Sequence, residues 1–144
     1  MGIPPRDSEG RVKPHDDHDI PDDAYVLRYI PPNWLPPDGH GGRRLSKGAF
    51  SPASISRDPY RSMSVDLLQP MLDDGLPPSG RKPADHEAVV RLKVGDLRNL
   101  GLKVGPDPGK NNDPYHAGVW GVVQQHRKKI CELSEWVEKP PDVR

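Results

Sequence analysis

The sequence has a single cysteine, few aromatic residues and no long apolar run. Of its 144 residues only Cys131 is a cysteine, so no disulfide can form within the chain. No N-terminal segment has the apolar core of a signal peptide, and no other segment has the length and apolarity of a membrane span. These absences predict a cytoplasmic protein that does not contact a membrane.

The sequence also lacks an excess of charge of either sign. It has 21 basic and 21 acidic residues, so no net field attracts it to a polyanion. Two short basic runs, 43–44 and 126–129, are not interleaved with the aromatic residues that a base-stacking surface would need. Nucleic acid is therefore disfavoured as a partner.

Apolar residues make up only 33% of the chain, which contains 14 glycines and 19 prolines. This composition predicts long loops around one modest core. The length suits a single domain, because two cores of half the size would need metals or disulfides. We expect an irregular arm over residues 1–23, a single α+β domain over 24–139 and a tail over 140–144.

Apolar patterning predicts the elements of this domain. Alternating or β-branched segments predict strands, and apolar residues at helical intervals predict two main helices. The strands are expected at 25–30, 63–67, 102–104 and 115–120, and the helices at about 84–100 and 122–138. Turn residues predict a long exposed loop over 33–47. The predicted fold class is α+β, with a small, mostly antiparallel sheet and long loops rich in proline and glycine.

Two segments resemble ligand sites but are better explained otherwise. His15 and His18 lie among three aspartates, yet no apolar pattern around them predicts a scaffold, which favours a solvated tail over a metal site. The run 105–110 ends in Gly-Lys like a phosphate-binding loop, but valine stands at 104 and asparagine at 111, where that motif requires glycine and serine or threonine. The sequence predicts no metal and no cofactor.

Polar residues on predicted strands form the candidate catalytic set. Ser46, Asp66 and His116 occur in the order of a hydrolase triad, but neither this serine nor its neighbours stand in Gly-x-Ser-x-Gly. Arg28 lies on another core-forming strand. In one interpretation, Arg28 pairs with Asp66 to brace the sheet, with His116 hydrogen-bonded nearby. In the other, Arg28 binds an anionic group and His116 acts as a general acid or base.

Four places in the chain carry a resemblance. Arg28, the run Arg-Leu-Ser-Lys-Gly-Ala-Phe at 44–50, Met-Ser-Val-Asp at 63–66 and Asp-Pro-Tyr-His-Ala-Gly-Val at 113–119 follow one another in that order. This set resembles a group of small uncharacterised bacterial proteins with Ser-x-x-Ala-Phe, Ser-Val-Asp and His-Ala-x-Val motifs. The resemblance implies a shared fold, in which these places form one structural unit, and implies no particular chemistry.

Two hypotheses for function follow. The first is a small bacterial accessory or interaction protein, a component of a larger complex, that binds another protein through Trp34, Trp120, Trp136 and the proline-rich loops, since aromatic residues dominate many interfaces. The second is a small enzyme acting on a nucleotide or another phosphorylated substrate. In it, Arg28 binds the anion, while the catalytic set consists of Ser46, Asp66 and His116.

Overall fold

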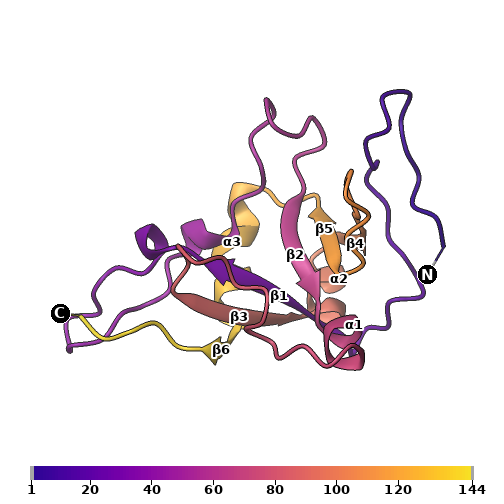
Figure 1. Cartoon of the computed structure of the whole chain (residues 1–144). Helices are drawn as coiled ribbons and strands as arrows, with labels where there is room; N and C mark the ends of the chain where they lie inside the picture. The colour runs from indigo at the N-terminus through magenta and orange to yellow at the C-terminus, as the bar shows by residue number, and fades with distance from the viewer. Residues whose placement is uncertain (1, 144) are drawn as a thin grey trace.

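A six-stranded antiparallel sheet forms the centre of the molecule (Figure 1). The computed structural model describes residues 2–143. In spatial order, the strands are β4 (Lys103–Pro106), β5 (His116–Trp120), β2 (Met63–Leu67), β1 (Tyr25–Ile30), β3 (Ala88–Lys93) and β6 (Glu135–Glu138). The helices are α1 (Leu68–Asp73), α2 (Val94–Asn99) and α3 (Gln124–Leu133). Two 3-10 turns, η1 (Pro32–Trp34) and η2 (Lys47–Phe50), follow β1. The predicted α+β class is confirmed.

The strands predicted at 25–30 and 63–67 are β1 and β2 with the same bounds. In β1, Val26 and Ile30 alternate onto one side of the sheet, and Pro31 and Pro32 prevent its continuation. In β2, Met63, Val65 and Leu67 occupy that same side. Alternation therefore identified the two strands that lie side by side in the middle of the sheet.

Both predicted long helices are wrong in part. The segment at 84–100 divides into β3 and the six-residue helix α2. Val89 and Val90 are buried on opposite sides of the sheet, because β3 is covered on both faces, and a strand of this kind has no apolar alternation. The segment at 122–138 is helical only to Leu133 and then forms β6 along β3.

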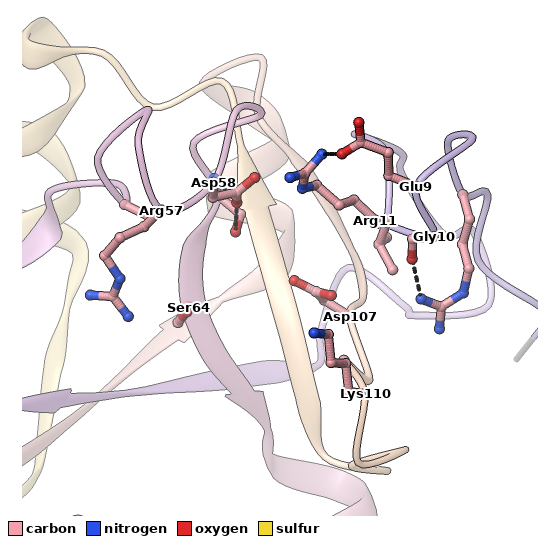
Figure 2. Close-up of a pocket in the computed structure, with 13 residues that line it drawn as sticks. Glu9, Gly10, Arg11, Arg57, Asp58, Ser64, Asp107 and Lys110 are labelled. Atoms are coloured by element: carbon pink, nitrogen blue, oxygen red, sulfur yellow. Dashed lines mark hydrogen bonds and ion pairs between the residues drawn. The ribbon is translucent and has the colours of Figure 1, made fainter.

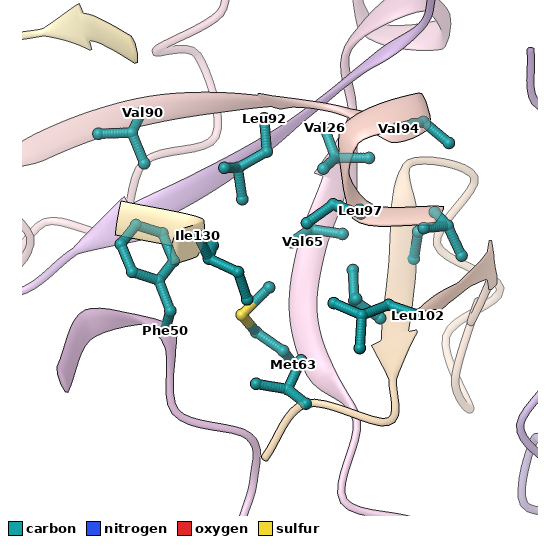
Figure 3. Packing of buried hydrophobic residues seen from close by; sticks show 14 of the residues in the cluster. Val26, Phe50, Met63, Val65, Val90, Leu92, Val94, Leu97, Leu102 and Ile130 are labelled. Carbon is teal, nitrogen blue, oxygen red and sulfur yellow. The ribbon is translucent and has the colours of Figure 1, made fainter. Parts of the chain in front are cut away.

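The main core lies between the sheet and helices α2 and α3 (Figure 3). We call this side of the sheet the core face; it carries Val26, Met63, Val65 and Val90. Phe50 of η2 is fully buried there near Ile130 of α3, as Figure 3 shows. The other side, which we call the polar face, carries the side chains of Ser64, Asp66 and His116. A small apolar cluster of Leu27, Met71 and Val89 lies on the polar face beneath α1.

The N-terminal arm (indigo in Figure 1) is bound to the domain, contrary to the expectation that it could bury too little surface to be ordered. Val12 and Ile20 are buried. The Asp17 N–H donates to the carbonyl of Val104 at 2.9 Å, which covers the outer edge of β4. Arg98 of α2 donates to four groups of the arm, the carboxylates of Asp16 and Asp22 and the carbonyls of Asp17 and Ile20, at 2.7–3.0 Å. The arm is thus ordered by contacts with residues about 80 positions away, which its own composition does not reveal.

The loop predicted at 33–47 is also more structured than expected. Leu35 is fully buried, and Pro37 and Arg43 form an isolated β-bridge. The ring of Trp34 covers Gly48 so closely that a Cβ at this glycine would overlap it. These contacts hold the loop against η2.

Candidate functional site

The structure does not bring Arg28, Ser46, Asp66 and His116 together. Asp66 and His116 are direct cross-strand partners of β2 and β5 on the polar face. Arg28 lies on the core face together with Val26 and Ile30, because every second residue of a strand points to the same side. Ser46, which precedes η2, is on that side as well. The enzyme hypothesis needs all four residues in one cleft, and the structure contradicts that arrangement.

Arg28 has a structural role in place of the predicted anion contact. Its Nε, Nη1 and Nη2 atoms donate to the carbonyls of Ala49, Ser64 and Ser51 at 3.0, 2.7 and 3.3 Å. Burial lowers the pKa of Arg28 to about 10. These bonds fasten the chain after η2 to β1 and β2. Ser46 is also structural, because its Oγ accepts the Gly48 N–H at 3.3 Å and caps η2.

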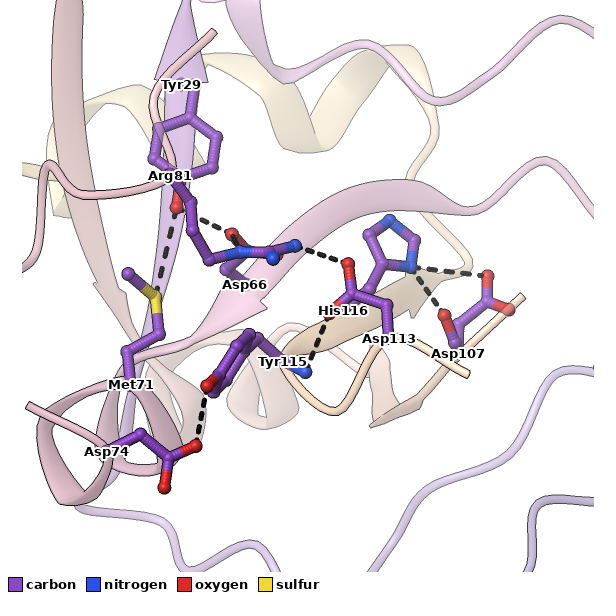
Figure 4. A network of polar contacts seen from close by, with 9 residues as sticks. All are labelled: Tyr29, Asp66, Met71, Asp74, Arg81, Asp107, Asp113, Tyr115 and His116. Atoms are coloured by element: carbon purple, nitrogen blue, oxygen red, sulfur yellow. Dashed lines mark hydrogen bonds and ion pairs between the residues drawn. The ribbon is translucent and has the colours of Figure 1, made fainter. Parts of the chain in front are cut away.

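Asp66 lies in a network of polar groups that satisfies it fully (Figure 4). Its side chain is buried, the residue being 3% exposed, and it accepts from the Tyr29 hydroxyl at 2.6 Å and from Arg81 Nε at 2.8 Å. Burial and then the hydrogen bond to Asp66 raise the pKa of Tyr29. Arg81 also forms an ion pair with Asp113, and its guanidinium lies 4.9 Å from the centre of the Tyr115 ring. Asp66 therefore pairs with Arg81, where the bracing interpretation placed Arg28.

His116 is oriented by the turn that follows β4. Its Nδ1 lies 2.6 Å from the carbonyl oxygen of Asp107, which can only accept, so Nδ1 carries the proton. In the neutral ring the lone pair is then on Nε2. The Asp107 carboxylate lies 4.0 Å from the same Nδ1. His116 is partly exposed. With the proton on Nδ1, its Nε2 atom is free to take up a proton as a general base or to accept a hydrogen bond.

A cavity of about 320 Å³ adjoins Asp107 on the polar face (Figure 2). The arm provides one wall, in which the bridge between Arg6 and Val12 closes a hairpin. The loop at 53–62 provides a second wall, and the turn at 107–110 a third. The Tyr60 hydroxyl donates to the Asp7 carboxylate at 2.7 Å and joins the first two walls. The cavity is thus built from three segments that are far apart in the sequence.

Charged side chains of both signs line this cavity, and some have no partner. Arg11 pairs with Glu9, as the dashed line in Figure 2 shows. Within residues 2–143, Arg57 and Lys110 have no carboxylate within 4 Å. The carboxylate of Asp107 accepts no hydrogen bond from this part of the chain, and burial raises its pKa. The cavity therefore offers both cationic donors and an unsatisfied carboxylate.

The three tryptophans do not form one contact surface. Trp120 is only 2% exposed, and its ring lies 5.1 Å from that of His15, centre to centre. Its predicted contact with a partner is therefore wrong. Trp34 and Trp136 remain partly exposed and pack against the edge of the core.

The polar residues of the arm do not meet at one point. His15 is turned toward the sheet, with Nδ1 2.9 Å from the carbonyl of Lys13, while the His18 side chain is 94% exposed. Asp16 pairs with Arg98. Over the described residues, no three histidine, cysteine or acidic side chains are grouped so that they could hold a metal ion. In the same range, no helix has the length and apolarity to cross a bilayer.

Comparison with protein-family models, with curated proteins and with solved structures finds no match. The resemblance to small bacterial proteins therefore stays a prediction. The structure does bring all four of its places into contact: Arg28 bonds to Ala49 of η2 and to Ser64 of β2, and β2 pairs with β5.

Sequence reasoning missed most residues of the cavity. Arg57, Asp107 and Lys110 lie in turns without a recognised motif, and only tertiary structure gathers them. One signal was present: Asp107 and Lys110 belong to the glycine- and proline-rich run that resembled a phosphate loop. The spacing of that run excludes a phosphate-binding loop. Its residues nevertheless form one wall of the cavity.

Proposed function

We propose that the protein is a small accessory protein that binds a partner protein through the cavity on its polar face. The observation that carries this proposal is the set of charged groups left without partners there. In the described part of the chain, Arg57 and Lys110 form no ion pair, and the half-buried Asp107 carboxylate accepts no hydrogen bond. Partial desolvation of the Asp107 carboxylate has a cost in stability, and perturbed groups of this kind are common at binding sites, while the two exposed cations are open to an anionic partner.

The mixed signs favour a peptide segment as the occupant. A segment with one acidic side chain would pair with Arg57 and Lys110, and a backbone or side-chain N–H of the same segment would donate to Asp107. A simple anion would leave Asp107 facing a like charge. The cavity, at about 320 Å³, admits one or two side chains and no folded element.

The test is recovery of a partner from the native cells with tagged wild-type chain and with an R57E/K110E double variant. Both substituted residues are exposed, so the variant is expected to fold. A variant with the same charge change at Lys93 and Lys103, which are exposed and outside the cavity, is the matched control. The proposal expects a protein that the wild type and the control recover and the R57E/K110E variant does not. Equal recovery with all three chains would refute it.

One observation favours an enzyme as the second candidate. His116 carries its proton on Nδ1 and directs the Nε2 lone pair away from Asp107, as a general base requires. The substrate would be a phosphorylated compound bound by Arg57 and Lys110, because the predicted ligand Arg28 is on the core face. Phosphate release from a panel of phosphate esters, lost in H116A but retained in S46A, would support this candidate. Activity that persists in H116A would exclude His116 as the base.

A further inference from the structure

A second charged surface lies on the core side of the molecule, where two basic runs meet. The runs at 43–47 and 127–128 are separated by 80 residues in the sequence. In the structure η2 packs against α3, and the Cys131 thiol lies 3.6 Å from the carbonyl of Leu45. Arg127 and Lys128 precede Cys131 by four and three residues, which places them on its flank of the helix. We call Arg43, Arg44, Lys47, Arg127 and Lys128 the basic surface.

No cation of the basic surface forms an ion pair with a described residue, although Glu132 lies one turn after Lys128 on α3. Within residues 2–143 none of its five cations has a carboxylate within 4 Å, whereas Arg81, Arg91 and Arg98 are all paired. The Nε atoms of Arg43 and Arg127 are buried and have no acceptor in this part of the chain. These buried atoms are out of reach of a partner, but the Arg44 side chain is exposed and donates no hydrogen bond within the described residues, so its N–H donors are open to an anionic partner.

A hollow of about 340 Å³ adjoins these cations and has the partly exposed Trp136 among its lining residues. It is lined by Arg43, Arg44, Leu45, Cys131, Ser134 and Trp136. Trp136 is partly buried against the edge of the core, which fixes its position. An aromatic face beside arginines is the arrangement on which proteins stack unpaired bases. Neither basic run contains an aromatic residue. In the folded chain, β6 places Trp136 beside Arg43 and Arg44.

We propose that the basic surface binds single-stranded nucleic acid, with one base in the hollow against Trp136 and neighbouring phosphates on the cations. This activity is separate from the partner-binding cavity on the polar face. A duplex does not fit, because its bases are stacked within the helix and the hollow has room for a single unstacked base. An acidic protein segment would satisfy the charges but would leave the indole without a stacking partner.

The test is fluorescence anisotropy of a labelled oligo-dT of about 10 nucleotides with the full chain, over a series of salt concentrations. Five phosphate contacts predict that log Kobs falls with log salt with a slope of about −3.5. The R44E/R127E variant is expected to bind at least about tenfold more weakly. K103E, an exposed lysine on β4 at the opposite edge of the sheet, is expected to bind as the wild type does.

Trp136 is tested separately, with a variant that retains an aromatic ring for packing. Oligo-dT is expected to quench the tryptophan fluorescence of the wild type, and W136F is expected to lose this quenching while unfolding at a similar temperature. The proposal is overturned if oligo-dT does not bind at low salt, or if K103E weakens binding as much as R44E/R127E. It is also overturned if W136F is quenched as the wild type is, or if polyglutamate competes as well as oligo-dT, because the occupant would then be an acidic protein.

Discussion

Replacing Arg98 with methionine tests whether one side chain holds the arm on the sheet. Arg98 donates to the Asp16 carboxylate and to the carbonyls of Asp17 and Ile20, all at 2.8–3.0 Å. It also reaches Asp22, but that carboxylate is 77% exposed and should contribute little. Methionine retains much of the packing of the arginine stem and removes all four bonds.

The magnitude follows from the three partly buried contacts. A hydrogen bond to a charged group contributes roughly 1.5–3 kcal/mol, and the three share one guanidinium, so their contributions do not add fully. Water will solvate some of the released oxygens. We expect R98M to weaken the attachment of the arm by about 2–3 kcal/mol, which corresponds to roughly 30- to 150-fold more frequent local opening.

Amide hydrogen exchange measures this opening directly. The informative amides are Asp17 N–H, which donates to Val104 O at 2.9 Å, and Val104 N–H, which donates to Asp16 Oδ1 at 3.0 Å. Both should exchange faster in R98M, while the amides between β1 and β3 keep their protection. R91M is the control, because Arg91 pairs with Glu135 on β6. Unchanged exchange at Asp17 in R98M would refute the argument that Arg98 holds the arm.

Three further predictions concern the core, the cavity and pH. Phe50→Ala should cost about 3–5 kcal/mol in urea denaturation, since Phe50 is fully buried, and a loss below about 1 kcal/mol would contradict its place in the core. Asp107→Asn should raise the Tm at pH 7, because burial raises the pKa of Asp107 and its charged form is disfavoured in the fold. The same substitution should weaken partner binding. A lower Tm would contradict this prediction. Burial acts to raise the pKa of Asp16, but the Val104 N–H and Arg98 outweigh it and hold the pKa below 3.8. The contribution of Asp16 to stability is therefore present above pH 3.8 and is lost as the pH falls through the lower pKa that Asp16 has in the folded protein. Protection of the arm amides in the wild type should fall over the same pH range. Protection that does not change with pH would count against this assignment.

The strands with local signals were predictable, and β3 and β6 were not. In β1 and β2, alternation marks one buried side, and prolines end β1. In β3, Val89 and Val90 are buried on opposite sides of the sheet, so the local pattern resembled a helix. The strand β6 is short and follows α3 after one residue, so its apolar residues continued the helical pattern.

The candidate site was less predictable, because its parts meet only in three dimensions. His116 was identified from its place on a strand, and it does lie on the polar face beside the cavity wall at Asp107. Arg28 shares a side of β1 with Val26 and Ile30, so it does not meet His116 on the polar face, and the carbonyls that it binds come from segments that no local pattern places beside it. Arg81, the true partner of Asp66, lies in a loop where no pattern indicates pairing.

The most direct test of the central claim is site-specific photo-crosslinking in cells. A photoreactive residue replaces Ser64, an exposed residue that lines the cavity, or Lys129, on the exposed surface of α3. The proposed function predicts a crosslinked partner from position 64, which disappears when Asp107→Asn or Lys110→Glu is added, and no such product from position 129. The claim is contradicted if position 64 yields no crosslink, or if the same product forms from both positions.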